Sequence, residues 1–244
     1  MRHLILSDIH ANLPALDAVL TAARNEWDEV VVLGDLVGYG ADPNGVIDCV
    51  RSMAPRLVIR GNHDKAACGL DTGEHFNQVA RFAARWTEEQ LTPDNRRYLR
   101  DLPSGPVDLD ARLEICHGAP FDEDHYIFDV VDAQRALDAR RRPVCVFGHT
   151  HVPAIFIAQG TQMSVDVPDG DVLALRLNTG ASYLVNPGSV GQPRDGDPRA
   201  AFALYDTAGT FTFRRVEYDV AAAQRRIAIA GLPQSLANRL AVGR

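Results

Sequence analysis

Residues 3–23, HLILSDIHANLPALDAVLTAA, join a short apolar run to a segment with helical spacing. The run through Leu6 is apolar and stops at Ser7-Asp8, which is typical of a buried strand. Asn12 is placed as a helix N-cap and Pro14 lies in the first turn. The apolar residues that follow recur with the period of a helix: Leu13, Leu16, Val19 and Leu20. This stretch therefore predicts a buried strand, a polar turn and a covering helix.

The same alternation continues through the first half of the chain. Further strands are predicted within 29–35 (EVVVLGD), 56–64 (RLVIRGNHD), 112–120 (RLEICHGAP) and 143–153 (PVCVFGHTHVP). Helices are predicted within 41–53 and around 130–141. Strands that alternate with helices predict an α/β fold, with a parallel sheet covered by helices on both faces.

The pattern changes twice along the rest of the chain. Residues 75–101 contain two amphipathic helical stretches divided at Thr92-Pro93, so a helical cap is expected at about 66–103, over one edge of a single domain of residues 1–244. From about residue 154, short alternating strands separated by Gly, Asp and Pro turns favour antiparallel pairing in a second sheet. A last helix is predicted to begin near Asp219, followed by a polar tail.

The composition limits the classes of function. Of the 244 residues, 46% are hydrophobic and 23% charged, as in an ordinary globular protein. No apolar run is long enough to span a membrane, and the N-terminus lacks a signal-peptide pattern, so a cytoplasmic protein is expected. The net charge of −7 argues against long nucleic acid as a partner. The four cysteines show no CxxC spacing and no paired arrangement, and disulfides are not expected. The oligomeric state is not predicted.

Polar side chains follow five of the predicted strands at equivalent positions. The carboxyl ends of strands in an open α/β sheet meet at one crevice, where ligands bind. The side chains delivered there are Asp8, His10, Asp35, Asn62, His63, His117, His149 and His151.

Each of these residues also has an ordinary structural explanation. Asp8 suits a turn or an N-cap, Asp35 a turn after glycine, Asn62 a left-handed turn and His117 a hydrogen-bonded interior position. Five such coincidences at equivalent strand ends are improbable together, so the pattern indicates a metal site. Three histidines lie outside the set and are interpreted as ordinary residues: His3, His75 and His125.

The residue types indicate which metals would bind. Imidazole and carboxylate ligands without thiolate favour manganese, iron, zinc or cobalt over calcium or copper(I). Seven candidate ligands are too many for one tetrahedral ion. Two ions about 3.5–4 Å apart that share a carboxylate would use them all. Asp35 follows a central strand and is the natural bridge.

Five motifs occur here in a recognisable order: DIH (8–10), GDLVGYG (34–40), GNHD (61–64), CHG (116–118) and GHTH (148–151). In this order the sequence resembles the calcineurin-like metallophosphoesterases. The resemblance covers about 150 residues, continues through LVNPGSVGQPR (184–194) and leaves no ligand position substituted. It implies a two-sheet αββα sandwich.

The resemblance also implies roles for individual residues. One metal would be held by Asp8, His10, Asp35 and His151. The second would be held by Asp35, Asn62, His117 and His149. His63 would be the catalytic histidine beside the phosphate. Apart from the resemblance, Asp64 follows His63 directly and is a candidate to orient its ring. The cofactors expected are two divalent ions, Mn²⁺ first, with Fe, Zn, Co or Ni as alternatives.

Two motif positions differ from those of related families and indicate which class of phosphoesterase the chain resembles. Serine/threonine phosphatases and symmetrical dinucleoside tetraphosphatases carry an Asp-Arg pair where this chain has Gly38 and Tyr39, and a glutamate where it has Asp64. Both changes favour the small bacterial and archaeal phosphodiesterases. Tyr39 and Arg194 are candidates for contact with substrate, with a packed tyrosine and a surface arginine as the alternatives.

The resulting prediction is a hydrolase of small phosphodiesters that uses a metal-bridging hydroxide. The alternatives are a phosphomonoesterase or nucleotide phosphatase, and a non-catalytic scaffold of the same fold. Action on long DNA is disfavoured by the acidic composition.

Overall fold

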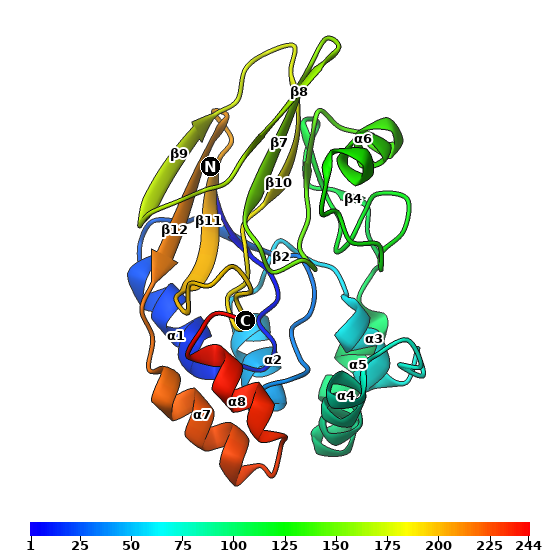
Figure 1. Cartoon of the computed structure of the whole chain (residues 1–244), viewed down its shortest axis with the longest axis vertical. Coiled ribbons are helices and arrows are strands. Elements are labelled where there is room, and N and C mark those ends of the chain that lie inside the picture. Colours follow the sequence, from blue (N-terminus) through cyan, green and yellow to red (C-terminus); the bar gives the residue numbers. More distant parts are fainter.

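The computed structural model describes residues 1–244 and contains two six-stranded mixed sheets (Figure 1). The first sheet has the order β3-β2-β1-β11-β12-β9. Its strands are β1 (Arg2–Leu6), β2 (Glu29–Val32), β3 (Leu57–Val58), β9 (Val172–Arg176), β11 (Ala200–Asp206) and β12 (Thr210–Val216). β1, β2 and β3 are parallel, whereas β11 runs antiparallel to β1.

The second sheet has the order β4-β5-β6-β10-β7-β8. Its strands are β4 (Val107–Asp108), β5 (Leu113–Ile115), β6 (Val144–Val146), β7 (Ala154–Gln159), β8 (Gln162–Asp166) and β10 (Ser182–Asn186). β5, β6 and β10 are parallel, and the other strands pair antiparallel. Each sheet thus has a parallel part whose carboxyl ends can share one edge.

The two sheets pack on each other through alternate side chains of their strands. Ile5 and Val31 of the first sheet share a buried core with Ile115, Val146 and Val185 of the second. Residues one position away in each strand point outward, because successive side chains alternate between the faces of a sheet.

Helices cover the two outward faces. α1 (Leu13–Ala22) and α2 (Pro43–Ser52) pack on the first sheet, where Leu4 and Leu6 are fully buried. α6 (Val130–Ala139) packs on the second, against Cys145 and Leu184. The αββα sandwich is therefore confirmed.

Local sequence signals set the start of these helices. Asn12 caps α1, since its Oδ1 accepts a hydrogen bond from the amide of Ala15 (3.2 Å). Thr92 does the same for α5 (Pro93–Asp101) through the amide of Asn95 (3.2 Å). The division at Thr92-Pro93 is confirmed.

Residues 66–103, assigned to a cap from the sequence, hold the end of α3 (Asn62–Cys68), α4 (Gln78–Gln90) and α5. Both α4 and α5 pack against α2 and α3. α7 (Val220–Ile229) and α8 (Gln234–Leu240) form a separate helical pair at the same end of the molecule (Figure 1). The cap as a distinct unit of a single domain stays a prediction.

The distribution of strands between the sheets differs from the sequence prediction. The strands after residue 154 do not form a sheet of their own: β7, β8 and β10 extend the second sheet, while β9, β11 and β12 extend the first. Helices also do not cover both faces of one parallel sheet, because one face of each sheet contacts the other sheet. The tail predicted to be polar contains α8, which buries Leu236 and Leu240.

The cysteine prediction needs one correction. All four are free thiols, but the Sγ atoms of Cys116 and Cys145 lie 3.5 Å apart at the paired strands β5 and β6. Spacing along the chain gives no sign of this contact, because it is made across the sheet.

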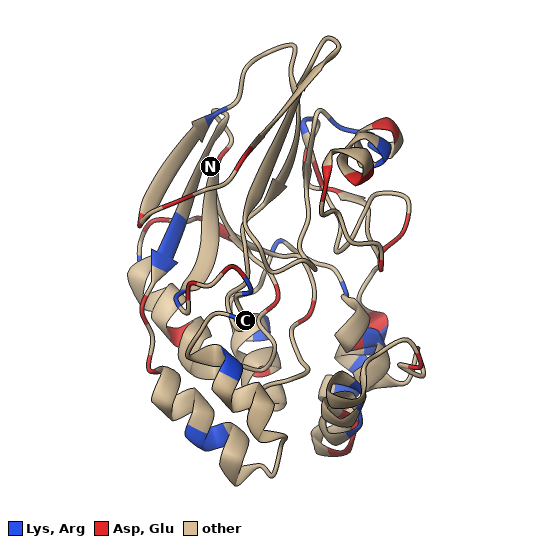
Figure 2. Ribbon diagram, in the orientation of Figure 1, with Lys and Arg blue, Asp and Glu red and all other residues tan.

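Charges of both signs are interspersed over the ribbon, for example on α4 and α6 (Figure 2). None of the helices combines the length and apolar character that a membrane span requires.

Candidate metal centre

The carboxyl ends of the parallel strands bring the seven predicted metal ligands together. Asp8 and His10 follow β1, and Asp35 follows β2. Asn62 opens α3 just after β3. The remaining three follow β5 and β6: His117, His149 and His151. Six of the seven are buried, and Asn62 is half-buried.

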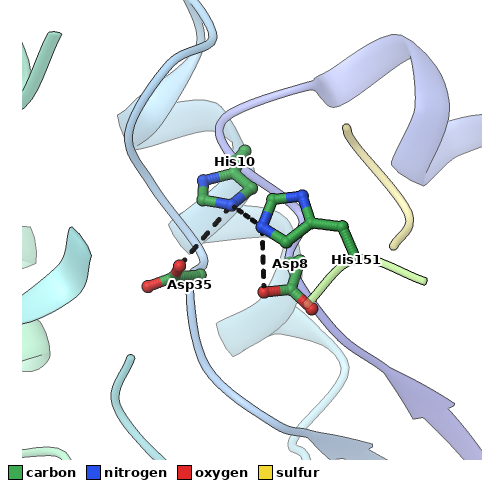
Figure 3. Close-up of side chains that lie close together, drawn as sticks. All are labelled: Asp8, His10, Asp35 and His151. Atoms are coloured by element: carbon green, nitrogen blue, oxygen red, sulfur yellow. Dashed lines mark hydrogen bonds and ion pairs between the residues drawn. The ribbon is translucent and has the colours of Figure 1, made fainter. Parts of the chain in front are cut away.

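The first cluster consists of Asp8, His10, Asp35 and His151, whose ligand atoms all lie within 4.8 Å of one another (Figure 3). The Nε2 atoms of His10 and His151 are 3.1 Å apart. His151 Nε2 lies 3.4 Å from Asp8 Oδ1, and His10 Nε2 lies 3.5 Å from Asp35 Oδ2.

The second cluster consists of Asp35, His117 and His149, with Asn62 beside them. His117 Nε2 lies 3.1 Å from His149 Nδ1 and 3.2 Å from Asn62 Oδ1. The same nitrogen lies 3.4 Å from Asp35 Oδ2. The amide and the two imidazoles therefore meet at one point next to the first cluster.

Backbone carbonyls fix the ring nitrogens of the first cluster. A carbonyl only accepts, so Nδ1 of His10 donates to Val37 O (3.0 Å) and Nδ1 of His151 donates to Gln192 O (2.6 Å). The Nε2 atoms of the neutral rings then carry lone pairs that face each other. A divalent ion bound by both nitrogens would relieve this repulsion, and a carbonyl behind a histidine is the usual support of a metal ligand.

The second cluster has the same kind of support. His117 Nδ1 donates to Leu33 O (2.9 Å), and His149 Nε2 donates to Asp124 O (3.0 Å). The nitrogens left over, His117 Nε2 and His149 Nδ1, point at each other. The donor set of each cluster, imidazole and carboxylate or amide oxygen, fits a divalent transition ion.

Asp35 connects the two clusters through a single oxygen. Its Oδ1 accepts a hydrogen bond from the amide of His63 (2.9 Å). Its Oδ2 is buried without a hydrogen-bond partner and lies between His10 (3.5 Å) and His117 (3.4 Å). A buried carboxylate oxygen without a hydrogen bond is costly, so this position favours positive charge on each side.

The pKa shifts show how burial and the Asp35 carboxylate act on the candidate ligands. Burial lowers the pKa of His10, His149 and His151 well below the ordinary value, so these rings are neutral and available as ligands. Burial also acts to lower the pKa of His117, but Asp35 outweighs it and raises that pKa to about 10. Burial acts to raise the pKa of Asp35, while the nearby histidines, His117 foremost, hold it well below its usual range.

The ligand loops adopt a backbone conformation that most residues avoid. Nine non-glycine residues have φ between +47° and +67°, and six of them are candidate site residues: Asp8, His10, Asp35, Tyr39, His149 and His151. Such conformations cost on the order of 1–3 kcal/mol each, and they concentrate at functional sites. The packed fold holds these six residues in place.

Glycines give the ligands room. A Cβ on Gly61 would lie 2.1 Å from Asp35 Oδ1, and one on Gly38 would lie 2.6 Å from His63 Nδ1. Gly38 also has φ +89°, which favours glycine. Because Gly61 and Gly38 have no side chain, Asp35 can lie against the backbone at Gly61, and the His63 ring can lie against the backbone at Gly38.

His63 lies beside both clusters but belongs to neither. Its ring is packed against Tyr39 (4.3 Å between centroids), Phe76 (4.5 Å) and His10 (5.0 Å). Its Nδ1 is buried without a hydrogen-bond partner, and burial lowers its pKa to about 4. The prediction that Asp64 orients this ring is wrong. The Asp64 carboxylate instead accepts from the amides of Gly61 (2.9 Å) and Val37 (3.2 Å), and so ties the α3 N-terminus to the Asp35 loop.

The two predicted substrate residues lie next to each other at this site. Tyr39 is buried against His10 (4.7 Å between ring centroids). The Nη2 atom of Arg194 lies 3.5 Å from the Tyr39 hydroxyl and 3.0 Å from Gln192 Oε1. Contact of either residue with a substrate stays a prediction.

Comparison with known proteins agrees with this geometry. The family model for the calcineurin-like phosphoesterase superfamily domain matches residues 1–210. The chain belongs to this superfamily.

Individual relatives extend over nearly the whole chain. A metallophosphoesterase from Sphaerobacter thermophilus has a crystal structure with a TM-score of 0.88 at 42% identity, covering 100% of this chain and 99% of that one. A protein of Methanocaldococcus jannaschii is 33% identical over 98% of this chain and 97% of its own length. The phosphodiesterase YfcE of Escherichia coli is 26% identical over 84% of this chain and 88% of its own length. The chain is thus a hydrolase of the phosphoesterase type, and its buried Asp/His clusters indicate divalent metal binding.

Sequence reasoning missed two aromatic residues of this phosphoesterase site. Tyr126 stacks on the ring of His149 (3.7 Å between centroids), and Phe76 stacks on His63. Both line a cavity of about 260 Å³ that Asn62 and His149 also reach. Tyr126 belongs to no motif, and Phe76 lies at the start of the amphipathic segment 75–101, where nothing marks it as a site residue.

The three histidines left out of the predicted set lie outside both clusters. His3 is next to Glu29, and His125 contacts Asp132 (3.0 Å). His75, however, lines the cavity of Phe76 and Tyr126. It is close to the site without being a candidate ligand.

Proposed function

We propose that the chain hydrolyses small phosphodiesters with two divalent ions, Mn²⁺ preferred over Fe, Zn, Co or Ni. The observation that carries this proposal is the position of Asp35 Oδ2, which has no hydrogen-bond partner and lies between two clusters of inward-facing ligand atoms. The ions would be held by Asp8, His10, Asp35 and His151, and by Asp35, Asn62, His117 and His149. When bound, such a pair would lower the pKa of a water molecule and stabilise the negative charge that develops on the phosphoryl group.

His63 is the group that assists the reaction from the protein side. With a pKa of about 4 the ring is neutral at neutral pH, and a neutral imidazole still has one N–H to donate. We place this hydrogen bond on a phosphoryl oxygen or on the departing oxygen. Tyr39 and Phe76 pack on the ring and hold its plane, so that the donor is oriented before substrate binds.

Two features support a diester over a monoester. Gly38 and Tyr39 replace the Asp-Arg pair whose arginine would bind the second charge of a monoester. A diester has an organic group on each side of the phosphorus, and the 260 Å³ cavity lined by Phe76 and Tyr126 lies where one such group can stack. The E. coli relative named a phosphodiesterase adds to this support.

The test compares kcat/KM for bis(4-nitrophenyl) phosphate and 4-nitrophenyl phosphate with Mn²⁺ added. We expect the diester to be preferred at least about tenfold, which corresponds to about 1.4 kcal/mol in the transition state. A clear monoester preference would favour the phosphomonoesterase or nucleotide phosphatase alternative. Absence of turnover on both, with two ions bound, would favour the non-catalytic scaffold.

The proposal also covers the partners of the protein and its cellular compartment. A small phosphate ester is the proposed substrate, without a role for membranes or long nucleic acid, and the cytoplasm is the proposed compartment. The net charge of −7 and the interspersed charges support a small ligand over a polyanion (Figure 2).

A further inference from the structure

The chain contains a single lysine, Lys65, and this residue is buried near the metal centre. It lies in α3, one turn after the candidate ligand Asn62. Its Nζ donates to both carboxylate oxygens of Asp124 (2.7 and 2.6 Å) and to Glu123 Oε1 (3.1 Å). Lysine is almost never buried unless it is paired, and here only 7% of the residue is exposed. The ion pairs therefore hold the Lys65 side chain in one place.

These ion pairs join two segments that carry candidate metal ligands. Arg60, two residues before Asn62, donates to the Glu123 carboxylate through Nε (3.2 Å) and Nη2 (3.0 Å). Arg60 and Lys65 thus place a cation on each side of Asn62, and both contact the loop between β5 and α6. That loop also contains His117, a candidate ligand of the second cluster. Opposite charges therefore connect the Asn62 segment to the His117 loop.

The same loop also supports His149. The Nε2 atom of His149 donates to the backbone carbonyl of Asp124 (3.0 Å), so that Nδ1 faces the second cluster, 3.1 Å from His117 Nε2. Tyr126, two residues further along the loop, stacks on the His149 ring (3.7 Å between centroids). Both contacts depend on the position of the loop, and the Asp124 carboxylate is fixed by Lys65.

The other candidate histidines are supported by the buried part of the fold. The carbonyls that accept from them belong to buried residues: Leu33, Val37 and Gln192. Asp124 lies instead in a loop, and its side chain is 47% exposed. The backbone hydrogen bonds of residues 118–126 run within the loop, so they set its shape rather than its place against α3. The charge-assisted hydrogen bonds of the ion pair supply that attachment.

We propose that Lys65 is a positioning residue for the second metal ion. Its ammonium group pairs with the Asp124 carboxylate and so fixes the carbonyl that orients His149. Its place on α3 keeps that histidine next to Asn62. This inference rests on the proposed two-ion function, and it assigns a residue outside the ligand set to one of the two ions.

The first test measures metal affinity without substrate. Metal-free protein is titrated with Mn²⁺, and the free ion is followed by its electron paramagnetic resonance signal. Loss of a group that supports a metal ligand typically costs about 10- to 100-fold in metal affinity. In Lys65→Met we expect this loss for one of the two ions, and Lys65→Arg, which keeps the charge, should recover part of it. Arg214→Met breaks an ion pair of similar length with Glu26 (2.7 Å) on β12 and should leave both affinities unchanged.

A double variant tests whether Lys65 acts through Asp124. Asp124→Asn removes the ion pair from the side of the loop and keeps the backbone carbonyl that His149 needs. Residues that act through one shared contact are not additive. Lys65→Met combined with Asp124→Asn should therefore lose no more Mn²⁺ affinity than Lys65→Met alone. A double variant that loses the product of the two single effects would contradict a shared role.

A second measurement needs neither a bound ion nor turnover. NMR on the metal-free protein follows the exchange of imidazole N–H protons with water, which is slow where a hydrogen bond protects them. In Lys65→Met the Nε2–H of His149 should exchange faster, because its acceptor carbonyl is no longer fixed. The Nδ1–H protons of His10 and His151 serve as controls within the same molecule and should be unaffected.

Two results would overturn the inference. One is unchanged Mn²⁺ affinity together with unchanged exchange at His149 in Lys65→Met. The other is an equal loss of affinity for both ions, which would make Lys65 a general stabilising residue. If the natural chain binds fewer than two ions, the proposed function fails, and the exchange at His149 alone decides whether Lys65 positions this ring. Thermal unfolding shows whether each variant is folded, and Asp124→Asn replaces Lys65→Met if the latter is not.

Discussion

Replacing Asp35 with asparagine tests the central feature of the site. The change keeps the shape of the side chain, and the amide oxygen can still accept from the amide of His63. The NH₂ group then occupies the position of Oδ2, between His10 Nε2 at 3.5 Å and His117 Nε2 at 3.4 Å. Both clusters lose a negative charge, and an N–H donor points to where the cations would bind.

The expected loss of activity follows from this double effect. Charge stabilisation by metal ions contributes several kcal/mol to the transition state, and losing about 4 kcal/mol lowers the rate about 10³-fold. Elemental analysis should show both ions depleted in Asp35→Asn. His10→Ala, which touches only the first cluster, should chiefly deplete one. Both proteins are assayed with bis(4-nitrophenyl) phosphate at equal total manganese.

Two results for Asp35→Asn would contradict a bridging role of Asp35. An Asp35→Asn protein that keeps two ions per chain and near-normal turnover would show that Oδ2 does not bridge the clusters. Loss of only one ion in Asp35→Asn would assign Asp35 to a single metal.

Three further perturbations give equally definite expectations. His63→Ala should keep both ions but lose about 10²- to 10⁴-fold in kcat on diesters with poor leaving groups, and less on nitrophenyl esters; loss of an ion on elemental analysis would make His63 a ligand. Gly61→Ala should lower metal content and thermal stability together, because its Cβ would lie 2.1 Å from Asp35 Oδ1; normal metal content would contradict this crowding. Burial acts to raise the pKa of Glu123, but Arg60 and Lys65 lower it overall, so this carboxylate stabilises the fold above its unfolded pKa and loses that effect as pH falls. Glu123→Gln should therefore reduce the free energy of unfolding by about 1 kcal/mol at pH 7 and by much less near pH 3 in denaturant titrations, and an equal loss at both pH values would be incompatible with an ionic contribution.

The sequence predicted which side chains meet at one edge of the sandwich because these candidate ligands have a local signature. Each follows a short apolar strand, and parallel strands bring their carboxyl ends to one edge whichever sheet they join. Asp8 and His149 were therefore predicted to meet although 141 positions separate them, and the amide of His149 indeed donates to the Asp8 carboxylate (3.2 Å).

The distribution of the later strands was not predictable in the same way. Short apolar runs between turn residues identify β10 and β11 as strands, but they do not identify the neighbours of these strands. β10 pairs in parallel with β6, whereas β11 joins the other sheet beside β1. Pairing depends on connections across the sandwich, which local pattern does not encode.

Groups of the site that belong to no sequence motif were also missed. Tyr126 and Phe76 reach the site from loops, and the backbone carbonyls of Val37 and Gln192 have no side-chain signature at all. The Asp64 prediction failed for a related reason. Adjacency to His63 in sequence suggested contact, but at the first turn of α3 the carboxylate points back to the amide of Gly61.

These observations together connect metal binding to the stability of the fold. The ligand loops hold left-handed residues that cost on the order of 1–3 kcal/mol each, and in the first cluster they bring two imidazole lone pairs within 3.1 Å of each other. The packed sheets must supply this energy when no cation is present. A ligand that binds only the folded chain stabilises it by an amount that grows with the logarithm of its affinity, so bound ions would offset strain that the sandwich alone carries. The strained backbone is thus best explained as part of the metal centre, because it keeps the ligands in place before an ion binds. The free energy of ion binding would then compensate for the conformational free energy that this preorganisation costs.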